Sequence, residues 1–261
     1  MPGGAETGER GARVILHAMK RGVATLAAAL GFVAGAATVG AAGTGVLGDP
    51  IGVLGAPAAP WHVVGLPRQT KPFTRYQVID RDGQRLLEID AHASYGTLVH
   101  ELDAGVDARH LSWSWRIERD NPATDPRTKD GDDHVAVVCA LFDLPIAAVP
   151  FVERQFLRLA RAFSGQSLPA ASLCYTWDAR LPRDTVLDSP FTRRVRLIVL
   201  HGIGEPLQTW RHEDRDLPSD FHRLFGDESV ALPPLRAVVV SGDADNTGGH
   251  SIAHLRELQL R

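Results

Sequence analysis

The stretch LSWSWRIERDNPATDPRTKDGDDHVAVVCALFD, which runs from Leu111 to Asp143, decides the fold. Its first part, 111–117, alternates large apolar and polar side chains, the pattern of a strand with one face in the core. Its last part, 135–142, is apolar throughout, as in a strand that is covered on both faces. The acidic loop between them is long for a compact domain, and such loops are usually functional or disordered. The stretch therefore predicts two core strands joined by a candidate functional loop.

Similar strand patterns lie on both sides of this pair, at 76–80, 84–90, 97–102, 173–177, 194–201, 236–241 and 255–260. Asp82-Gly83 separates the first two, and it is a strong hairpin signal because glycine accepts a positive φ. Helical patterns are confined to about 150–164 and 219–225. About nine strands with few helices predict an all-β fold, an antiparallel β-sandwich or jelly roll with one or two short helical insertions.

The helix expected at 150–164 is amphipathic. Its apolar residues recur at helical spacing and are predicted to face the core: Val152, Phe156, Leu159, Ala160 and Phe163. Its charged residues are expected on the solvent side: Glu153, Arg154, Arg158 and Arg161.

Length and charge restrict the class of protein. With 261 residues and 44% hydrophobic content, the chain can bury one sizeable core. The net charge is −3, so nothing indicates a nucleic-acid partner. Residues 1–42 carry four basic and two acidic side chains, or +2, which leaves −5 for the remainder (−3 − 2 = −5).

The basic N-terminal part has the pattern of a signal peptide. Met19-Lys20-Arg21 precedes a long uncharged run of Ala, Gly, Val and Leu that ends in small residues. We expect export with cleavage near Ala42, and hence a periplasmic or secreted protein without membrane contact after cleavage. The alternative is an uncleaved membrane anchor. The expected organisation is an extension with signal peptide at 1–42, a Gly/Pro/Ala-rich linker at 43–72 and a β-sandwich domain at 73–261.

The two cysteines, Cys139 and Cys174, both fall in predicted strands. In an oxidising compartment they can form one disulfide. Two buried thiols that pack as small hydrophobic side chains are the alternative.

Two polar clusters adjoin strongly apolar strands. Asp130, Asp132 and Asp133 come directly before one strand, and Asp243, Asp245 and Asn246 follow another. If these strands are antiparallel neighbours, both clusters meet at one edge and form a shared ligand site. Carboxylate oxygens suit Ca²⁺, with Asp243, Asp245 and Asp132 as the expected ligands. The alternative is that Asp, Asn and Gly form turns here and cap their own backbone.

Other residues are weaker candidates. Trp210 and Trp177 adjoin polar loops and could stack on a ligand, although Trp177 could equally end a core strand. Glu213 and Asp216 are the candidate catalytic acid/base pair, since glycoside hydrolysis needs two facing carboxylates. A solvated ion-pair loop is the alternative, because arginines lie beside both.

Five segments together resemble a bacterial family of unknown function, DUF3047. They are WSWRIE, KDGDDHVAVVCALFD, LCYTW, WRHEDRDLPSDFHRLFG and VVVSGDADNTGG, in that order within about 73–260. The resemblance implies a secreted or periplasmic β-sandwich and no particular reaction. The chain departs from the family pattern at His134, where a basic residue near the strand start is usual, and in the closing strand at 256–258.

Two functions from different classes follow from these observations. The first is a non-catalytic domain that binds a glycan or another cell-envelope ligand. The second is a polysaccharide hydrolase or lyase that uses the loop carboxylates. A structural role in the envelope is a third reading. The shape of the site distinguishes the first two, because hydrolysis needs a cleft with two carboxylates about 5–9 Å apart.

Overall fold

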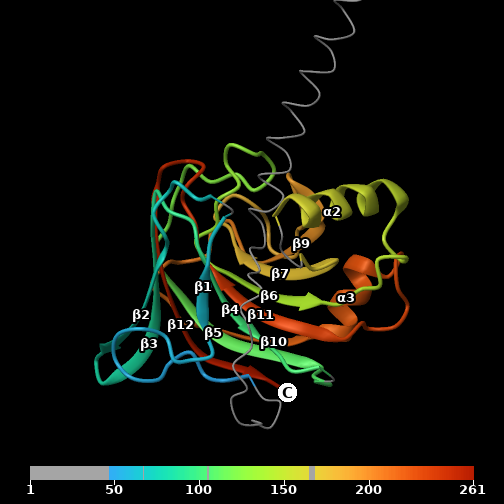
Figure 1. The fold of residues 1–261 in the computed structure, drawn as a ribbon. Coiled ribbons are helices and arrows are strands. Elements are labelled where there is room, and N and C mark those ends of the chain that lie inside the picture. Colours follow the sequence, from blue (N-terminus) through green and yellow to red (C-terminus); the bar gives the residue numbers. More distant parts are fainter. Residues whose placement is uncertain (1–46, 67, 105, 165–167) are drawn as a thin grey trace, which may run out of the picture.

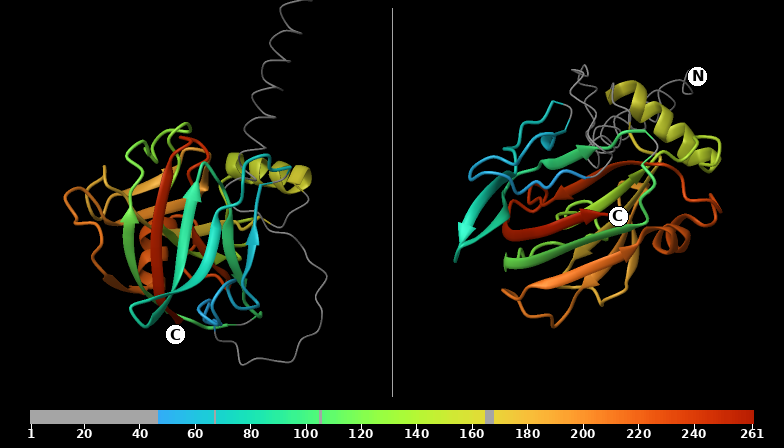
Figure 2. Two further views of the ribbon diagram at one scale, coloured as in Figure 1. Left: turned by 90° about the vertical axis from the view of Figure 1, so that its left-hand side faces the viewer. Right: turned by 90° about the horizontal axis from the view of Figure 1, so that it is seen from below.

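The computed structural model describes residues 47–66, 68–104, 106–164 and 168–261, and these form two β-sheets packed face to face (Figures 1 and 2). The seven-stranded sheet has the order β1 (His62–Val64), β4 (Thr97–Glu101), β11 (Leu235–Ser241), β6 (Val137–Phe142), β7 (Ala171–Trp177), β9 (Thr192–His201) and β8 (Val186–Ser189). The five-stranded sheet has the order β10 (Arg211–Asp216), β5 (His110–Arg119), β12 (His250–Leu260), β3 (Gln84–His92) and β2 (Arg75–Arg81). The prediction of an all-β sandwich is confirmed.

In the described residues two helices accompany the sheets, α2 (Phe151–Ser164) and α3 (Leu217–Phe225), close to their predicted positions. Within the described part of the chain, neither helix is long and apolar enough to cross a membrane. The expected signal peptide and its cleavage near Ala42 lie outside the described residues.

The core lies between the sheets and is built on the alternation in β5. Trp113 and Trp115 are almost fully buried, as the alternation predicts. The Trp113 ring lies 5.3 Å from the ring of Tyr175 on β7, and the Trp115 ring lies 6.3 Å from that of Trp177. Tyr175 and Trp177 therefore point inward from the seven-stranded sheet. Because side chains alternate along a strand, Cys174 and Thr176 point to the outer face of the same sheet.

The structure corrects the expected strands at several places. β7 and β9 pair in parallel, although the prediction was fully antiparallel. β10 is a strand where the sequence suggested a polar loop, and it pairs with β5 at the sheet edge. β10 shows no alternation of apolar and polar residues, because all six of its side chains are polar and only that of Glu213 is fully buried. β12 begins at His250 rather than Leu255, and β8 was not anticipated.

The orientation of α2 is also a correction. Val152 and Phe156, predicted to face the core, are 61% and 47% exposed. Ala160 is buried as predicted, and Leu157, which was not predicted to face the core, is buried as well. An arginine fixes this orientation, since the Arg161 guanidinium donates to a backbone oxygen in the next loop, Leu168 O, at 2.8 Å through Nε.

The two cysteines form a disulfide between directly paired positions of β6 and β7. This decides between the two readings left open by the sequence. Cys174 faces outward, so the disulfide lies on the outer face of the seven-stranded sheet, away from the five-stranded sheet.

Candidate functional site

The two acidic loops meet at one end of the seven-stranded sheet. β6 and β11 are antiparallel neighbours with Val137 opposite Ser241, so the loop before β6 and the loop after β11 emerge at the same edge. Asp133 joins them: its Oδ1 accepts from the backbone N–H of Asn246 at 3.0 Å, and its Oδ2 accepts from the backbone N–H and hydroxyl of Thr247 at 2.8 and 2.6 Å. The shared edge expected from the sequence is present.

Two more hydrogen bonds fasten the loops. Asp243 Oδ1 accepts from the backbone N–H of His134 at 2.7 Å. The Asn246 side-chain amide donates to the backbone oxygen of Asp132 at 3.0 Å. Asp133, Asp243 and Asn246 thus bond backbone groups of the opposite loop.

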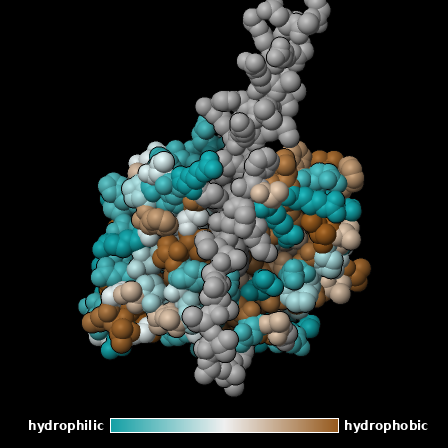
Figure 3. Space-filling model, viewed as in Figure 1, coloured by the Kyte–Doolittle hydropathy of each residue, from teal (hydrophilic) through white to brown (hydrophobic). Residues whose placement is uncertain are grey.

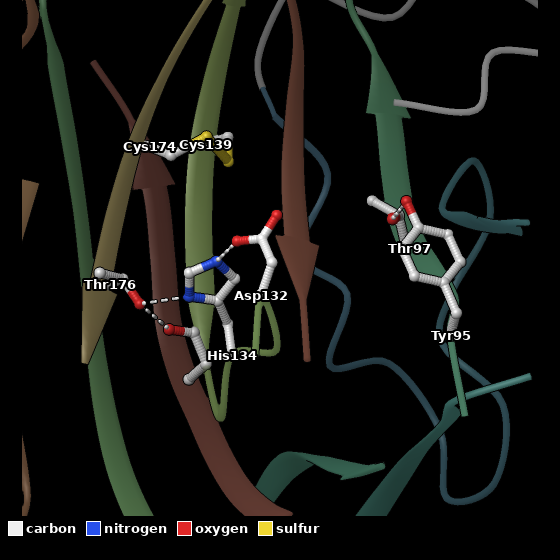
Figure 4. The surroundings of a disulfide bond; sticks show 8 residues. Tyr95, Thr97, Asp132, His134, Cys139, Cys174 and Thr176 are labelled. Atoms are coloured by element: carbon white, nitrogen blue, oxygen red, sulfur yellow. Dashed lines mark hydrogen bonds and ion pairs between the residues drawn. A yellow bond between two sulfur atoms is a disulfide. The ribbon is translucent and has the colours of Figure 1, made fainter. Parts of the chain in front are cut away.

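His134 lies between a carboxylate and a hydroxyl (Figure 4). Its Nε2 is 3.4 Å from Asp132 Oδ1, and its Nδ1 is 3.3 Å from Thr176 Oγ1 on β7. Ser189 Oγ donates to the other oxygen of Asp132 at 3.3 Å. Burial alone would lower the pKa of His134, but the hydrogen bond and charge of Asp132, with other nearby carboxylates, raise it to about 9. At neutral pH the pair is an imidazolium beside a carboxylate.

A cavity of about 120 Å³ opens beside this pair on the outer face of the seven-stranded sheet. One row of paired strand residues, Val239, Cys139, Cys174 and Leu197, forms its apolar floor. The polar lining comes chiefly from loops and strand ends: Tyr95, Thr97, Asp132, His134, Ser189, Ser241, Asp243, Asp245 and Asn246. The remaining lining is apolar: Leu66, Val137, Phe191 and Val195. The cavity therefore has an apolar floor and a polar rim.

Two carboxyl groups of the rim, those of Asp243 and Asp245, have raised pKa values. Burial raises the pKa of Asp245 to about 6, and the charge of Asp133 adds to the effect. Burial raises the pKa of Asp243 well above its usual value, although the neighbouring His134 charge lowers it. Both carboxyl groups therefore hold a proton more tightly than an exposed aspartate does. The rim then offers both donors and acceptors of hydrogen bonds.

The carboxylates that approach one another most closely are Asp133, Asp243 and Asp245, each with a ligand atom within 4.8 Å of the others. The expected metal ligand Asp132 is not in this group and pairs with His134. Both Asp133 oxygens already accept hydrogen bonds, and Ca²⁺ needs six to eight oxygen ligands. The donor set fits calcium poorly, and binding of Ca²⁺ stays a prediction.

The suggested acid/base pair lies away from the cavity. Glu213 is buried on β10, where its Oε1 is 2.6 Å from His201 Nε2 and accepts from the indole of Trp115 at 3.1 Å. Asp216 caps α3, accepting from the backbone N–H of Ser219 at 2.8 Å. Both side chains have structural partners, and neither lines the cavity.

The two tryptophans also lie elsewhere. Trp177 is buried and stacks on His201 at 4.8 Å, and Trp210 lies under the guanidinium of Arg256 at 4.2 Å. Asp130 is exposed and does not line the cavity. Of the expected ligand residues, the structure places four on the rim: Asp132, Asp243, Asp245 and Asn246.

Sequence reasoning missed the aromatic and apolar part of the cavity. Phe191 comes from the β8–β9 turn, Tyr95 from the β3–β4 loop and Leu66 from the segment after β1. No periodicity marks these residues, because each lies outside a regular element. His134 carried a signal, since it departs from the family pattern directly after the acidic loop.

Comparison with known proteins gives a family and loose structural likenesses. A family model described as "Protein of unknown function (DUF3047)" matches residues 59–259. No curated protein matches this chain. A cellulase derived from Cel12A of Rhodothermus marinus is 13% identical, with 77% of this chain and 91% of that chain covered and a TM-score of 0.38.

Two further structures are similar at this level. The xyloglucanase domain of NopAA from Sinorhizobium fredii, in complex with cellobiose, is 8% identical, with 78% of this chain and 98% of that chain covered and a TM-score of 0.37. TmCBM61 in complex with β-1,4-galactotriose is 8% identical, with coverages of 78% and 88% and a TM-score of 0.35. Scores this low carry no inference about the site.

Proposed function

Because the chain belongs to the DUF3047 family, whose description names no activity, we propose a function from the cavity itself. The protein is an exported, non-catalytic binding domain that holds one polyhydroxylated six-membered ring, such as a terminal sugar of a glycan or envelope polymer. The observation that carries this proposal is the cavity with an apolar floor and a rim of hydrogen-bonding residues from loops and strand ends.

The size of the cavity favours a single ring. A cavity of about 150 Å³ in another protein holds benzene, so the smaller volume of about 120 Å³ can take at most one ring and excludes an oligosaccharide. Ligand pockets for drug-sized molecules are larger, about 300–1,000 Å³. A longer glycan would therefore enter with one end and leave the rest in solvent.

The chemistry of the lining suits a sugar. A pyranose presents C–H groups on its faces and hydroxyl groups around its edge. The apolar floor and Phe191 can contact the faces, as aromatic side chains do with apolar groups. Asp245 and Asn246 can accept from and donate to the hydroxyl groups. Asp133, held by three hydrogen bonds, keeps the loops in place before a ligand arrives.

Hydrolysis is the second candidate, and one observation favours it. Burial raises the pKa of Asp243 well above its ordinary value and that of Asp245 to about 6, so the rim holds two carboxyl groups with the raised pKa values that acid/base catalysis uses. Against it, Asp243 already accepts a backbone hydrogen bond and is almost fully buried, which leaves little access to a glycosidic oxygen. We therefore place binding first.

Export is part of the proposal. The signal-peptide pattern of residues 19–42 supports it, and so does the disulfide between Cys139 and Cys174, because structural disulfides persist in oxidising compartments. A cell-surface or periplasmic site is also where a domain that recognises envelope glycans would meet its ligand.

Titration calorimetry with monosaccharides and short glycans tests the proposal, after a glycan array has selected candidates. We expect Asp245→Asn and Phe191→Ala each to weaken binding by about tenfold, the typical effect of losing one good polar or packing contact. Asp130→Asn is the matched control, because Asp130 is exposed on the same acidic loop as Asp132. Equal affinity in all variants, or no glycan bound, would refute the proposal, and released reducing ends would establish hydrolysis instead.

A further inference from the structure

We propose that the exposed face of α2 is a docking surface for an anionic lipid bilayer. This face, called the α2 face below, consists of Phe151, Val152 and Phe156 with Arg158 beside them. The proposal is independent of the ligand cavity, which no α2 residue lines.

The α2 face is apolar where a surface helix should be polar. Phe151, Val152 and Phe156 are 69%, 61% and 47% exposed. At about 100° per residue they fall within an arc of about 140° on one side of the helix. Single exposed apolar side chains are common, but a group on one helix marks an interaction surface. Figure 3 shows brown, hydrophobic side chains gathered at the upper right, where Figure 1 places α2.

The orientation is fixed by the protein, so the face does not turn inward. Leu157, on the opposite side of the helix, and Ala160, at the edge of the face beside Phe156, are both buried. Arg161 donates to Leu168 O, and Arg154 donates to Val149 O at 3.2 Å. Rotating the α2 face toward the core would break both bonds and expose Leu157. The helix also lies at the periphery of the sandwich in every view, which leaves its outer side accessible (Figures 1 and 2).

The charges of the helix select the partner. α2 carries Arg154, Arg158 and Arg161 against Glu153, a net +2 in a chain of net charge −3. Glu153 lies 3.8 Å from the Arg194 guanidinium, which offsets its charge. An apolar face on a helix of net positive charge, with Arg158 at its edge, is the pattern of a helix that lies in the interface of an anionic membrane.

A second copy of the chain suits this face less well. A two-fold contact would place the same helix of each copy against the other, with Arg158 near its own counterpart. Like charges at such a contact repel, whereas phosphate headgroups attract them. The sequence analysis expected no membrane contact of the mature body, but it also placed this face in the core, and the structure turns it to solvent.

Three inserted side chains give weak, reversible binding, which is useful in combination with a second contact. An envelope glycan in the cavity, or a retained N-terminal anchor, would supply that contact. The α2 face would then orient the sandwich on the membrane.

The test uses the full chain with Phe156→Trp as a reporter in sedimentation and fluorescence experiments with vesicles. The change keeps the face apolar and places an indole on it. With vesicles of phosphatidylcholine and phosphatidylglycerol, we expect a blue shift relative to wild-type protein and quenching by brominated lipid. With phosphatidylcholine alone, and at high salt, both signals should fall because the arginines lose their attraction. This readout reports α2 itself, whatever the N-terminal segment does.

A triple variant measures the contribution of the face. Phe151→Ser, Val152→Ser and Phe156→Ser together should reduce the partition coefficient by at least about tenfold. The matched control replaces three other exposed apolar residues, Val53, Leu54 and Val230, by serine and should bind as wild type does. A reporter that stays unquenched on vesicle-bound protein, or equal partition of the triple variant and wild type, would overturn the proposal. So would self-association in solution that the triple variant abolishes, which would assign the face to a second copy.

Discussion

Asp133 shows how one side chain determines the geometry of a whole rim. It is almost fully buried and accepts three hydrogen bonds from the opposite loop. We expect Asp133→Ala to lower the free energy of unfolding by about 3 kcal/mol, because hydrogen bonds to a buried charged group are strong and their donors would be left unpaired. Urea denaturation followed by tryptophan fluorescence measures this. Asp130→Ala, a control on the same loop, should leave the midpoint unchanged.

His134 predicts a pH dependence of stability. Its pKa is about 9 in the folded protein against an ordinary value of 6.5, so the folded state binds this proton more tightly than the unfolded state. The stabilisation is complete below pH 6.5 and is lost as the pH rises through 9. It amounts to at most about 3 kcal/mol.

Denaturation midpoints between pH 6 and pH 10 test this for wild type and His134→Gln. The wild type should lose stability across the interval, whereas the variant, which has no titrating ring, should lose much less. Parallel curves for the two proteins would show that the Asp132 pair does not raise this pKa.

At the level of single residues, the sequence predicted that the two acidic loops meet but not which groups their side chains contact. Clusters of Asp beside apolar strands indicated one polar edge, and the structure places Asp132, Asp243 and Asp245 there. Which of these aspartates pairs with His134 and which accepts a backbone hydrogen bond depends on side-chain rotamers, and no sequence pattern indicates a rotamer. Phe191 was missed for a similar reason. It lies in the turn between β8 and β9, and tertiary packing rather than a sequence period brings it to the cavity.

Among the elements, α3 begins after an N-cap residue, Asp216, that the sequence analysis named as a candidate catalytic acid or base. Asp216 accepts from Ser219 N–H, and hydrogen bonding by the Ser219 side chain, followed by this backbone bond, lowers the pKa of its carboxyl. We expect Asp216→Ala to cost about 1 kcal/mol of stability, the usual value of an N-cap, with Asp216→Ser retaining most of it. Thermal denaturation measures both. Ligand affinity should be the same in all three proteins, and a loss of binding on replacing Asp216 would return it to the site.

The disulfide between β6 and β7 closes a loop of sequence separation 35. Replacing Cys139 and Cys174 together by alanine should lower the free energy of unfolding by about 4 kcal/mol, because the unfolded chain regains the entropy of the open loop. Urea denaturation of the double variant and of the reduced wild type should agree. A double variant as stable as the oxidised wild type would contradict this estimate.

Element types followed from periodicity, and the failures have physical causes. β5 and β6 were predictable because one alternates and the other is apolar throughout. β10 was missed because an edge strand needs few apolar residues. The sequence analysis assigned the α2 face to the core because the face is apolar. An apolar stripe on a helix does not indicate which element, if any, packs against it. The hydrogen bond from the Arg161 guanidinium to the backbone oxygen of Leu168 supports the observed orientation of the helix.

For the whole molecule, the export hypothesis can be tested directly. Expressed in a bacterium with its own leader, the protein should be recovered from the periplasm or medium with a new N-terminus near residue 43. Intact-mass spectrometry should show the loss of the leader and of two hydrogens for the disulfide. An intact Met1 or Met19 in the membrane pellet would contradict cleavage and favour the anchor.

The position of β12 bears on when the protein can fold. This strand, the last along the chain, lies between β3 and β5 in the middle of the five-stranded sheet. A ribosome that has not yet released residues 250–260 therefore carries a nascent chain whose sheet is split into two unconnected parts. The five-stranded sheet can therefore close only after β12 has been synthesised.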